Sequence, residues 1–415
     1  MRKILLGTTA VAGAALFAVS TAQAQQAPQL RIGGYMEFNV GIINDTMDKP
    51  QAGVTGTPAA NAPRRNSTDF RQGDTEIHVF VTGKAANGIS YGATIELELD
   101  AADNVANGTG VSADEAYITI SSPTLGSLRL GDEDSAASLM QTRVPTITGL
   151  GPDNMWDEFA ARSPDGQAPY LISGINDGSD ATKIVYLSPQ FAGFDFGLSF
   201  APNGREGESF RNTGGAAVLQ RDKTDSIQNE LSYALRYRGT FGGVGVAATF
   251  AGMQAEPQAQ AVAGAAATQQ DIKAYHVGVN LTAFGFTVGG EYNWGKYSGA
   301  STGRTALNNG LDESSNWAIG VTYTAGALAV GAFYGVGERD NGRAAGGVNL
   351  ADREQTVWGI GAVYTLAPGL DLVANYIRVE DRNLMNALPV TANTNAIALR
   401  ERNVDAFILG TRIAF

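Results

Sequence analysis

The fold class is decided by the nine C-terminal residues, which read Phe407-Ile408-Leu409-Gly410-Thr411-Arg412-Ile413-Ala414-Phe415. One set of alternate positions, from Phe407 to Phe415, is nearly all apolar, and the set between them includes Gly410, Arg412 and Ala414. Successive side chains of a strand point to opposite faces, so this segment predicts a strand with one apolar and one mixed face. An apolar face that meets lipid needs no covering layer, and we therefore expect a membrane strand here.

The same alternation recurs along the chain in segments of about ten residues, which is typical of strands rather than helices. The clearest segment is Ile89–Asp100, where apolar residues alternate with Ser90, Thr94, Glu96 and Glu98. Further apolar faces lie within Leu30–Ile42, Phe194–Phe200, Leu231–Tyr237, Val244–Phe250, Tyr275–Leu281 and Trp317–Tyr323.

The connections between these segments alternate in length. Seven are short and rich in turn residues: Gly83–Gly88, Ser121–Gly126, Ser188–Gly193, Gly239–Gly243, Thr282–Gly285, Thr324–Gly326 and Leu366–Gly369. Eight are long and polar: Asn44–Phe70, Asp100–Ser112, Gly131–Thr182, Ala201–Ser226, Ala251–Asp271, Lys296–Ser314, Gly337–Arg353 and Glu380–Asn403. Strict alternation places all long loops at one rim, and the count predicts an all-β, sixteen-stranded antiparallel transmembrane β-barrel with an aqueous lumen. The strands of a soluble β-sandwich or solenoid would also alternate apolar and polar residues, but such a fold would not require an even number of strands.

The N-terminal segment has the layout of a secretory signal peptide. Arg2 and Lys3 precede an apolar stretch, Ile4–Val19, and the small-residue motif Ala22-Gln23-Ala24 follows it. We expect a signal peptide over residues 1–24 and a barrel domain over residues 25–415. A transmembrane anchor is the alternative, but the apolar stretch is short and a cleavage motif follows it.

Composition narrows the partners and the chemistry. The chain carries a net charge of −12, which argues against nucleic acid and anionic membrane surfaces as partners. It has no cysteine and only two histidines, which leaves little for a zinc site or a thiol nucleophile. After the signal segment no run of 18 apolar residues occurs, so a membrane form must be a closed barrel.

Four passages carry a resemblance to a known family: Tyr91–Glu98, Leu125–Asp134, Leu187–Phe194 and the terminal strand that closes on Phe415. In this order after a signal peptide, they make nearly the whole mature chain similar to the Gram-negative general porins of the alphaproteobacterial type. The resemblance implies a homotrimer in the outer membrane, surrounded by lipid and lipopolysaccharide, that passes small hydrophilic solutes and ions. It also implies that the third long loop folds inside the barrel, and that Phe415 is the signal read by the barrel-assembly machinery.

The third long loop, Gly131–Thr182, holds nine acidic residues and two basic ones. Inside a lumen these carboxylates would favour cations by focusing the field, whereas in an external loop they would only keep the loop solvated. The predicted constriction residues are Asp132, Glu133, Asp134, Asp153, Asp157 and Glu158.

Charged residues also alternate onto the predicted inner wall. The acids are Glu96 and Glu98, together with Glu76, and the bases are Arg31, Arg129, Arg236, Arg238 and Arg412. Opposed to an acidic loop, the bases would create a transverse field, and the alternative is that they pair with local acids and brace the wall. General porins usually set a basic wall against an acidic loop, so acids on this wall depart from the pattern.

The remaining candidates are weaker. Asp132-Glu133-Asp134 with Asp180 offers oxygen ligands for a structural calcium, although the spacing is not that of an EF-hand, and no other cofactor is expected. His78 and His276 share no local motif with a serine and are interpreted as ordinary lumen residues.

The sequence thus predicts a non-catalytic, cation-preferring passive diffusion channel. The alternatives are a substrate-specific channel, which would need a ladder of aromatics along the lumen, and an outer-membrane hydrolase.

Overall fold

The computed structural model describes residues 26–48, 54–55, 67–99, 111–160, 171–172, 174–175, 180–204, 227–257, 269–297, 311–342, 350–383, 397–398 and 401–415. The predicted signal peptide, residues 1–24, lies outside these ranges, and its removal stays a prediction.

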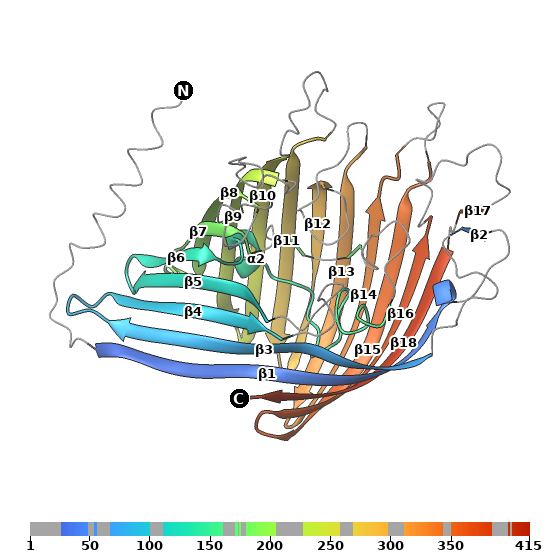
Figure 1. The fold of residues 1–415 in the computed structure, drawn as a ribbon, viewed down its shortest axis with the longest axis horizontal. Coiled ribbons are helices and arrows are strands. Elements are labelled where there is room, and N and C mark those ends of the chain that lie inside the picture. Colours follow the sequence, from blue (N-terminus) through green and yellow to red (C-terminus); the bar gives the residue numbers. More distant parts are fainter. Residues whose placement is uncertain are drawn as a thin grey trace, which may run out of the picture.

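The described strands close into one ring (Figure 1), in the order β1-β18-β16-β15 and then down in sequence to β3. The barrel strands are β1 (Gln26–Asp45), β3 (Thr68–Lys84), β4 (Ser90–Glu98), β5 (Ser112–Ser122), β6 (Gly126–Asp132), β7 (Thr182–Leu187), β8 (Phe194–Asn203), β9 (Ile227–Phe241), β10 (Val244–Pro257), β11 (Ile272–Ala283), β12 (Phe286–Lys296), β13 (Ser314–Ala325), β14 (Leu328–Arg339), β15 (Arg353–Ala367), β16 (Leu370–Arg382) and β18 (Glu401–Ala414). Every pairing between these neighbours is antiparallel. The predicted sixteen-stranded antiparallel barrel is therefore confirmed.

The alternation of short and long connections is also confirmed. All seven predicted short turns join consecutive barrel strands, and the long connections fall where the polar segments were found. The sequence did not predict two details. Strand β10 continues to Pro257, and a two-residue strand in the first long connection, β2 (Val54–Thr55), pairs in parallel with β17 (Ile397–Ala398) in the last.

The two ends of the chain close the ring. Strand β1 pairs with β18 from Tyr35 opposite Ala414 to Asp45 opposite Val404, and Gly34 and Phe415 exchange backbone hydrogen bonds of 3.1 and 3.0 Å. The opposite edge of β1 pairs with β3. Since a barrel strand at an open edge would leave backbone groups without partners in lipid, this double pairing satisfies both edges of β1.

Most barrel strands present an exposed apolar face to the outside of the ring. On β8, for example, Phe194, Phe196, Leu198 and Phe200 are exposed, whereas the residues between them are buried. The exposed set contains many of the apolar alternations read from the sequence, because the period of two fixes which residues share a face. Among the described residues, no helix is long and apolar enough to cross a membrane.

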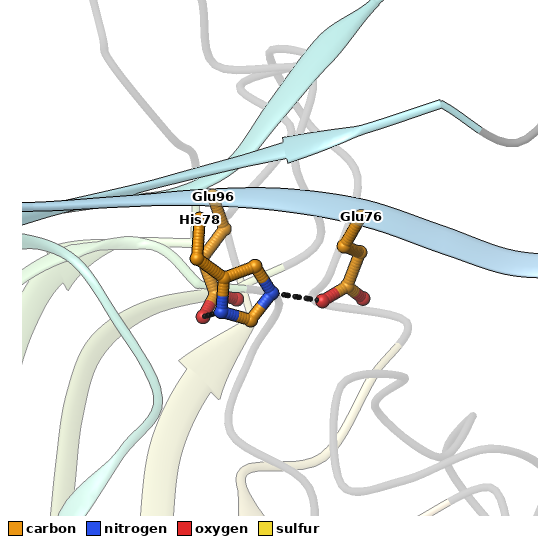
Figure 2. Close-up of side chains that lie close together, drawn as sticks. All are labelled: Glu76, His78 and Glu96. Atoms are coloured by element: carbon orange, nitrogen blue, oxygen red, sulfur yellow. Dashed lines mark hydrogen bonds and ion pairs between the residues drawn. The ribbon is translucent and has the colours of Figure 1, made fainter. Parts of the chain in front are cut away.

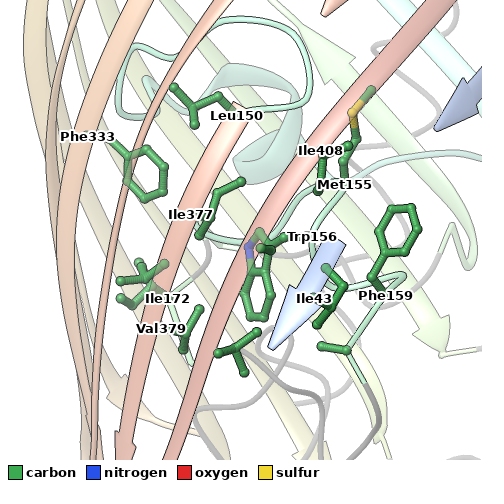
Figure 3. Packing of buried hydrophobic residues seen from close by; sticks show 14 of the residues in the cluster. Ile43, Leu150, Met155, Trp156, Phe159, Ile172, Phe333, Ile377, Val379 and Ile408 are labelled. Carbon is green, nitrogen blue, oxygen red and sulfur yellow. The ribbon is translucent and has the colours of Figure 1, made fainter. Parts of the chain in front are cut away.

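The largest cluster of buried apolar residues lies on the other face of the wall (Figure 3). Trp156 and Phe159, from the connection between β6 and β7, pack with wall residues that include Ile43, Ile377 and Ile408. Both aromatic side chains are almost completely buried. The core of this protein thus sits between the wall and a connection rather than between two sheets.

Candidate functional site: the inner wall and the β6–β7 connection

The wall binds the backbone of the β6–β7 connection at several points. Polar side chains on β8, β10, β11, β15 and β16 contact it, all on the face opposite to the exposed apolar one. The pairs are Ser199 Oγ with Ala136 N (2.9 Å), Thr249 Oγ1 with Met140 O (2.8 Å), Asn280 Nδ2 with Arg143 O (3.1 Å), Asn375 Nδ2 with Thr148 O (3.2 Å) and Gln355 Oε1 with Leu171 N (2.7 Å). These hydrogen bonds satisfy buried backbone groups of an irregular segment, which would otherwise destabilise it.

Glycines on the wall make room for the same connection. A Cβ added to Gly41 would lie 2.5 Å from the ring of Phe159, and one added to Gly320 would lie 2.5 Å from the carbonyl oxygen of Pro145. Within the connection, the short helix α2 (Ala136–Met140) begins at Ser135, whose side chain accepts a hydrogen bond from Ser138 N. The wall and the connection therefore fit each other along its described length.

The six predicted constriction residues divide into two groups. Asp132, Glu133 and Asp134 lie where β6 ends. Asp132 accepts a hydrogen bond from Thr182, Glu133 is fully buried with Arg129 Nη1 at 2.8 Å, and Asp134 accepts a bond of 3.2 Å from Ser138 Oγ. Glu133 is thus a paired, buried acid, which reduces its influence on ions in the lumen.

Asp153, Asp157 and Glu158 lie on the turn that carries Trp156, and all three are partly exposed. Burial raises the pKa of the Asp153 carboxyl above its ordinary value, and the charge of Arg143 opposes that rise. Asp157 N donates a 2.8 Å hydrogen bond to Asn154 O, which tightens the turn. These three acids form the partly exposed charged group of this turn, and burial still acts on the Asp153 carboxyl.

The predicted basic wall residues have local partners. Arg236 Nη2 and Arg238 Nη2 lie 2.7 and 2.8 Å from the same Asp195 carboxylate oxygen. Arg412 Nε lies 3.2 Å from Glu37, and the Arg31 guanidinium lies over the ring of Phe80 at 4.3 Å. With the Arg129–Glu133 pair, these contacts agree with the bracing interpretation more than with a free basic wall.

Acids gather on strands β3 to β5 and at the two ends of the β6–β7 connection. Glu115, Asp134 and Asp180 place carboxylate oxygens within 4.8 Å of one another, and Glu96 lies close to His78 and Glu76. Sequence reasoning missed Glu115 because its approach to Asp180 depends on the β5–β6–β7 register, although its parity on β5 was readable. Oxygen ligands of this kind suit calcium, which stays a prediction.

The two histidines have different surroundings. His276 on β11 is fully buried, and its Nδ1 lies 2.7 Å from Asn293 Oδ1. His78 on β3 lies between two carboxylates, with Nε2 at 2.6 Å from Glu76 and Nδ1 at 3.1 Å from Glu96. These contacts are with amide and carboxylate groups, whereas a hydrolase triad requires a histidine bonded to its nucleophile.

Comparison with known proteins agrees with this architecture. A family model described as Gram-negative porin matches residues 7–384. No curated protein is similar enough in sequence to be matched. Similar solved structures include the anion-selective porin from Comamonas acidovorans, with 16% identity, coverage of 94% of this chain and 100% of that chain, and a TM-score of 0.59. The outer membrane channel DcaP of Acinetobacter baumannii has 11% identity, coverage of 94% and 98%, and a TM-score of 0.56.

A trimer form of OmpT from Vibrio cholerae has 11% identity, coverage of 94% and 100%, and a TM-score of 0.53. At such identities these structures support the fold alone. The family match extends over most of the chain and coincides with a closed barrel that is apolar outside and charged inside. On this evidence the chain belongs to the Gram-negative porin family.

Proposed function

We propose that the protein is an outer-membrane channel through which small hydrophilic solutes and ions diffuse passively. The observation that carries this proposal is the closed ring of sixteen strands with an apolar outer face and a polar inner wall. A barrel of this size encloses more space than its own wall side chains can fill. The account assigns no catalytic residue, because the family match and the closed barrel point to a channel rather than an enzyme.

The β6–β7 connection is the proposed constriction. Its hydrogen bonds to the inner face of five strands, and the packing of Trp156 and Phe159, support a position within the lumen. Irregular backbone at membrane depth is tolerated where it is held by protein or lines a water-filled cavity. Pore diameter and the charge of this segment then select what passes.

A preference for cations is the finer part of the proposal. Four of the predicted basic residues each lie against a local acid, whereas Asp153, Asp157 and Glu158 are partly exposed on the connection. Glu96 on β4, Glu115 on β5 and Asp180 at the end of the β6–β7 connection add further carboxylates. A lumen with excess negative charge raises the local concentration of cations. The Comamonas acidovorans protein is called anion-selective, so selectivity in this fold has to be measured.

The assembly proposals rest on the family. We infer a homotrimer in contact with lipid and lipopolysaccharide, with Phe415 read by the barrel-assembly machinery during insertion. Phe415 is 67% exposed beyond the last strand, which leaves the ring accessible to a partner. Deleting Phe415 should lower the yield of folded, heat-modifiable protein more than deleting a residue of the β10–β11 connection beyond Pro257, and equal yields would contradict the role.

Swelling of proteoliposomes in sugars of graded size tests the function. Passive diffusion predicts that the swelling rate falls smoothly with solute size and does not saturate with concentration. A substrate-specific channel would saturate for one solute class. Release of fatty acid from the liposome lipid, or no swelling with correctly folded protein, would contradict the proposal.

A further inference from the structure

We propose that Glu76, His78 and Glu96 form a binding site for one divalent transition-metal ion of the zinc class on the inner wall (Figure 2). The imidazole of His78 lies between the two carboxylates. Its Nε2 is 2.6 Å from Glu76 Oε2, and its Nδ1 is 3.1 Å from Glu96 Oε1. A donor atom from each residue lies within 4.8 Å of the other two.

The strand register brings the three side chains together. Glu76 and His78 are two residues apart on β3 and therefore share a face, and Glu96 on β4 is the direct cross-strand partner of His78. The opposite face of this sheet is the outer one, where Ile32 of β1, the partner of Val79, is 59% exposed. The three ligand side chains thus belong to the wall that faces the lumen.

The neighbourhood holds the imidazole in place. The rings of Tyr35 and Phe80 contact it edge-on, with centroids 6.1 and 5.8 Å away. Tyr35 lies opposite Glu76 in the β1–β3 register, and the Arg412 guanidinium lies over the Tyr35 ring at 4.2 Å. These ring contacts restrict rotation of the imidazole and so fix its orientation at the site.

The donor set favours a zinc-class ion. One imidazole nitrogen and two carboxylate oxygens provide three protein ligands, and water supplies the fourth in an open tetrahedral site. Zinc ligands lie about 2.0–2.2 Å from the ion, so donor atoms around it are roughly 3.4 Å apart. One ion binds only one nitrogen of the His78 ring, so Glu96, which now lies against Nδ1, or Glu76, which now lies against Nε2, has to swing to the side of the other carboxylate. The donor atoms already lie within 4.8 Å of one another, so a change of side-chain rotamer provides this movement. Calcium and magnesium prefer larger sets of oxygen ligands.

The site is accessible and balanced in charge. The side chains of Glu76, His78 and Glu96 are 17–19% exposed, so an ion in the lumen can reach them while most of each side chain stays fixed. Two carboxylates and a neutral imidazole compensate the charge of a divalent cation. Imidazole nitrogen is a ligand typical of zinc, copper and nickel, which distinguishes this cluster from the carboxylates Glu115, Asp134 and Asp180.

Calorimetric titration of the refolded mature chain with zinc chloride tests the proposal, with and without excess calcium chloride. We expect one site per chain that calcium does not abolish, and at least a tenfold loss of affinity in His78→Gln and in Glu96→Gln. Glu354→Gln, which removes an exposed carboxylate paired at 4.0 Å with Arg382, is the matched control and should bind as the wild type does. Heat-modifiability on a gel verifies that each variant is folded. If one of the two ligand variants misfolds, the affinity of the other one tests the site.

A second readout is thermal unfolding. Zinc that binds only the folded barrel should raise the unfolding temperature of the wild type and of Glu354→Gln, and it should leave His78→Gln unchanged. Absence of binding to folded wild type, or equal affinity in the wild type and both ligand variants, would overturn the site. These measurements need folded protein but no conduction, so their outcome is separate from that of the channel proposal.

Discussion

Replacing Trp156 by alanine should widen the pore without unfolding the barrel. The indole of Trp156 is fully buried among residues of β1, β16 and β18, and its Nε1 donates a 3.2 Å hydrogen bond to the carbonyl of Pro152. Those contacts join the turn at residues 151–160 to the wall. The side chain makes no part of the barrel hydrogen-bond ladder, so its loss acts mainly on the connection.

The magnitude follows from burial. Truncating a fully buried tryptophan to alanine costs about 3–5 kcal/mol in lost apolar contact and in the cavity that remains. Each 1.4 kcal/mol is about a factor of ten, so the population with the turn detached from the wall should rise roughly 10²-fold to several 10³-fold. Phe159 and the wall hydrogen bonds farther along the connection should keep the rest attached.

Liposome swelling and single-channel recording measure the result. We expect a larger solute size limit and noisier, higher conductance in Trp156→Ala, with normal heat-modifiability. Trp317→Ala is the matched control, because Trp317 lies on the outer face with 37% exposure and contacts Tyr334 instead. An unchanged size limit and unchanged noise in folded Trp156→Ala would refute the idea that this turn narrows the lumen.

Four further predictions extend the account. Replacing Asp153, Asp157 and Glu158 by amides should lower the cation preference measured as reversal potential in a salt gradient, and less so at high salt because of screening; an unchanged potential would exclude them from the filter. Burial raises the pKa of Asp153, so on acidification this carboxylate loses its charge at a higher pH than an ordinary aspartate, and above that pKa its ionisation opposes packing of the turn. The cation preference of the wild type should therefore decline as the pH falls through the pKa of Asp153, and it should decline less in Asp153→Asn. Asp381→Asn should lower the free energy of unfolding by about 3–5 kcal/mol, and with it the unfolding temperature, because Arg353 is fully buried against Asp381. Arg382→Gln, which removes the exposed ion pair with Glu354, should lower the free energy of unfolding by only about 0–1 kcal/mol, and equal losses in the two variants would contradict this burial argument. Cysteines at Ile42 and Phe407, which face each other across β1 and β18, should cross-link in a chain without native cysteine, whereas Ile42 with Phe194 should not; failure of facing pairs would contradict closure.

The barrel could be predicted from the sequence because each of its signals is local. Alternation over ten residues fixes the two faces of a strand, and turn residues such as Gly242 and Gly243 fix where a hairpin reverses. The pairing of β1 with β18 followed from the need to satisfy both edges in lipid. The β2–β17 pair was not predictable, because two-residue strands carry no periodic signal.

The charges of the lumen could be predicted only in part. Their parity on each strand is local, but their partners are set by register between strands. Asp195 lies 41 residues from Arg236 in sequence and meets it because β8 and β9 pair Asp195 with Arg236 directly. In the same way, the register between β3 and β4 places Glu96 opposite His78. The sequence alone had argued against a metal site, because it has only two histidines and no cysteine.

The central claim is that the folded protein encloses a continuous water-filled path, and recording from planar bilayers tests it most directly. Purified, heat-modifiable mature protein should insert with discrete conductance steps, and the step size should rise with the salt concentration, as it does for ions that move through water. Folded protein that inserts without any conductance step, or with steps independent of salt, would contradict the channel.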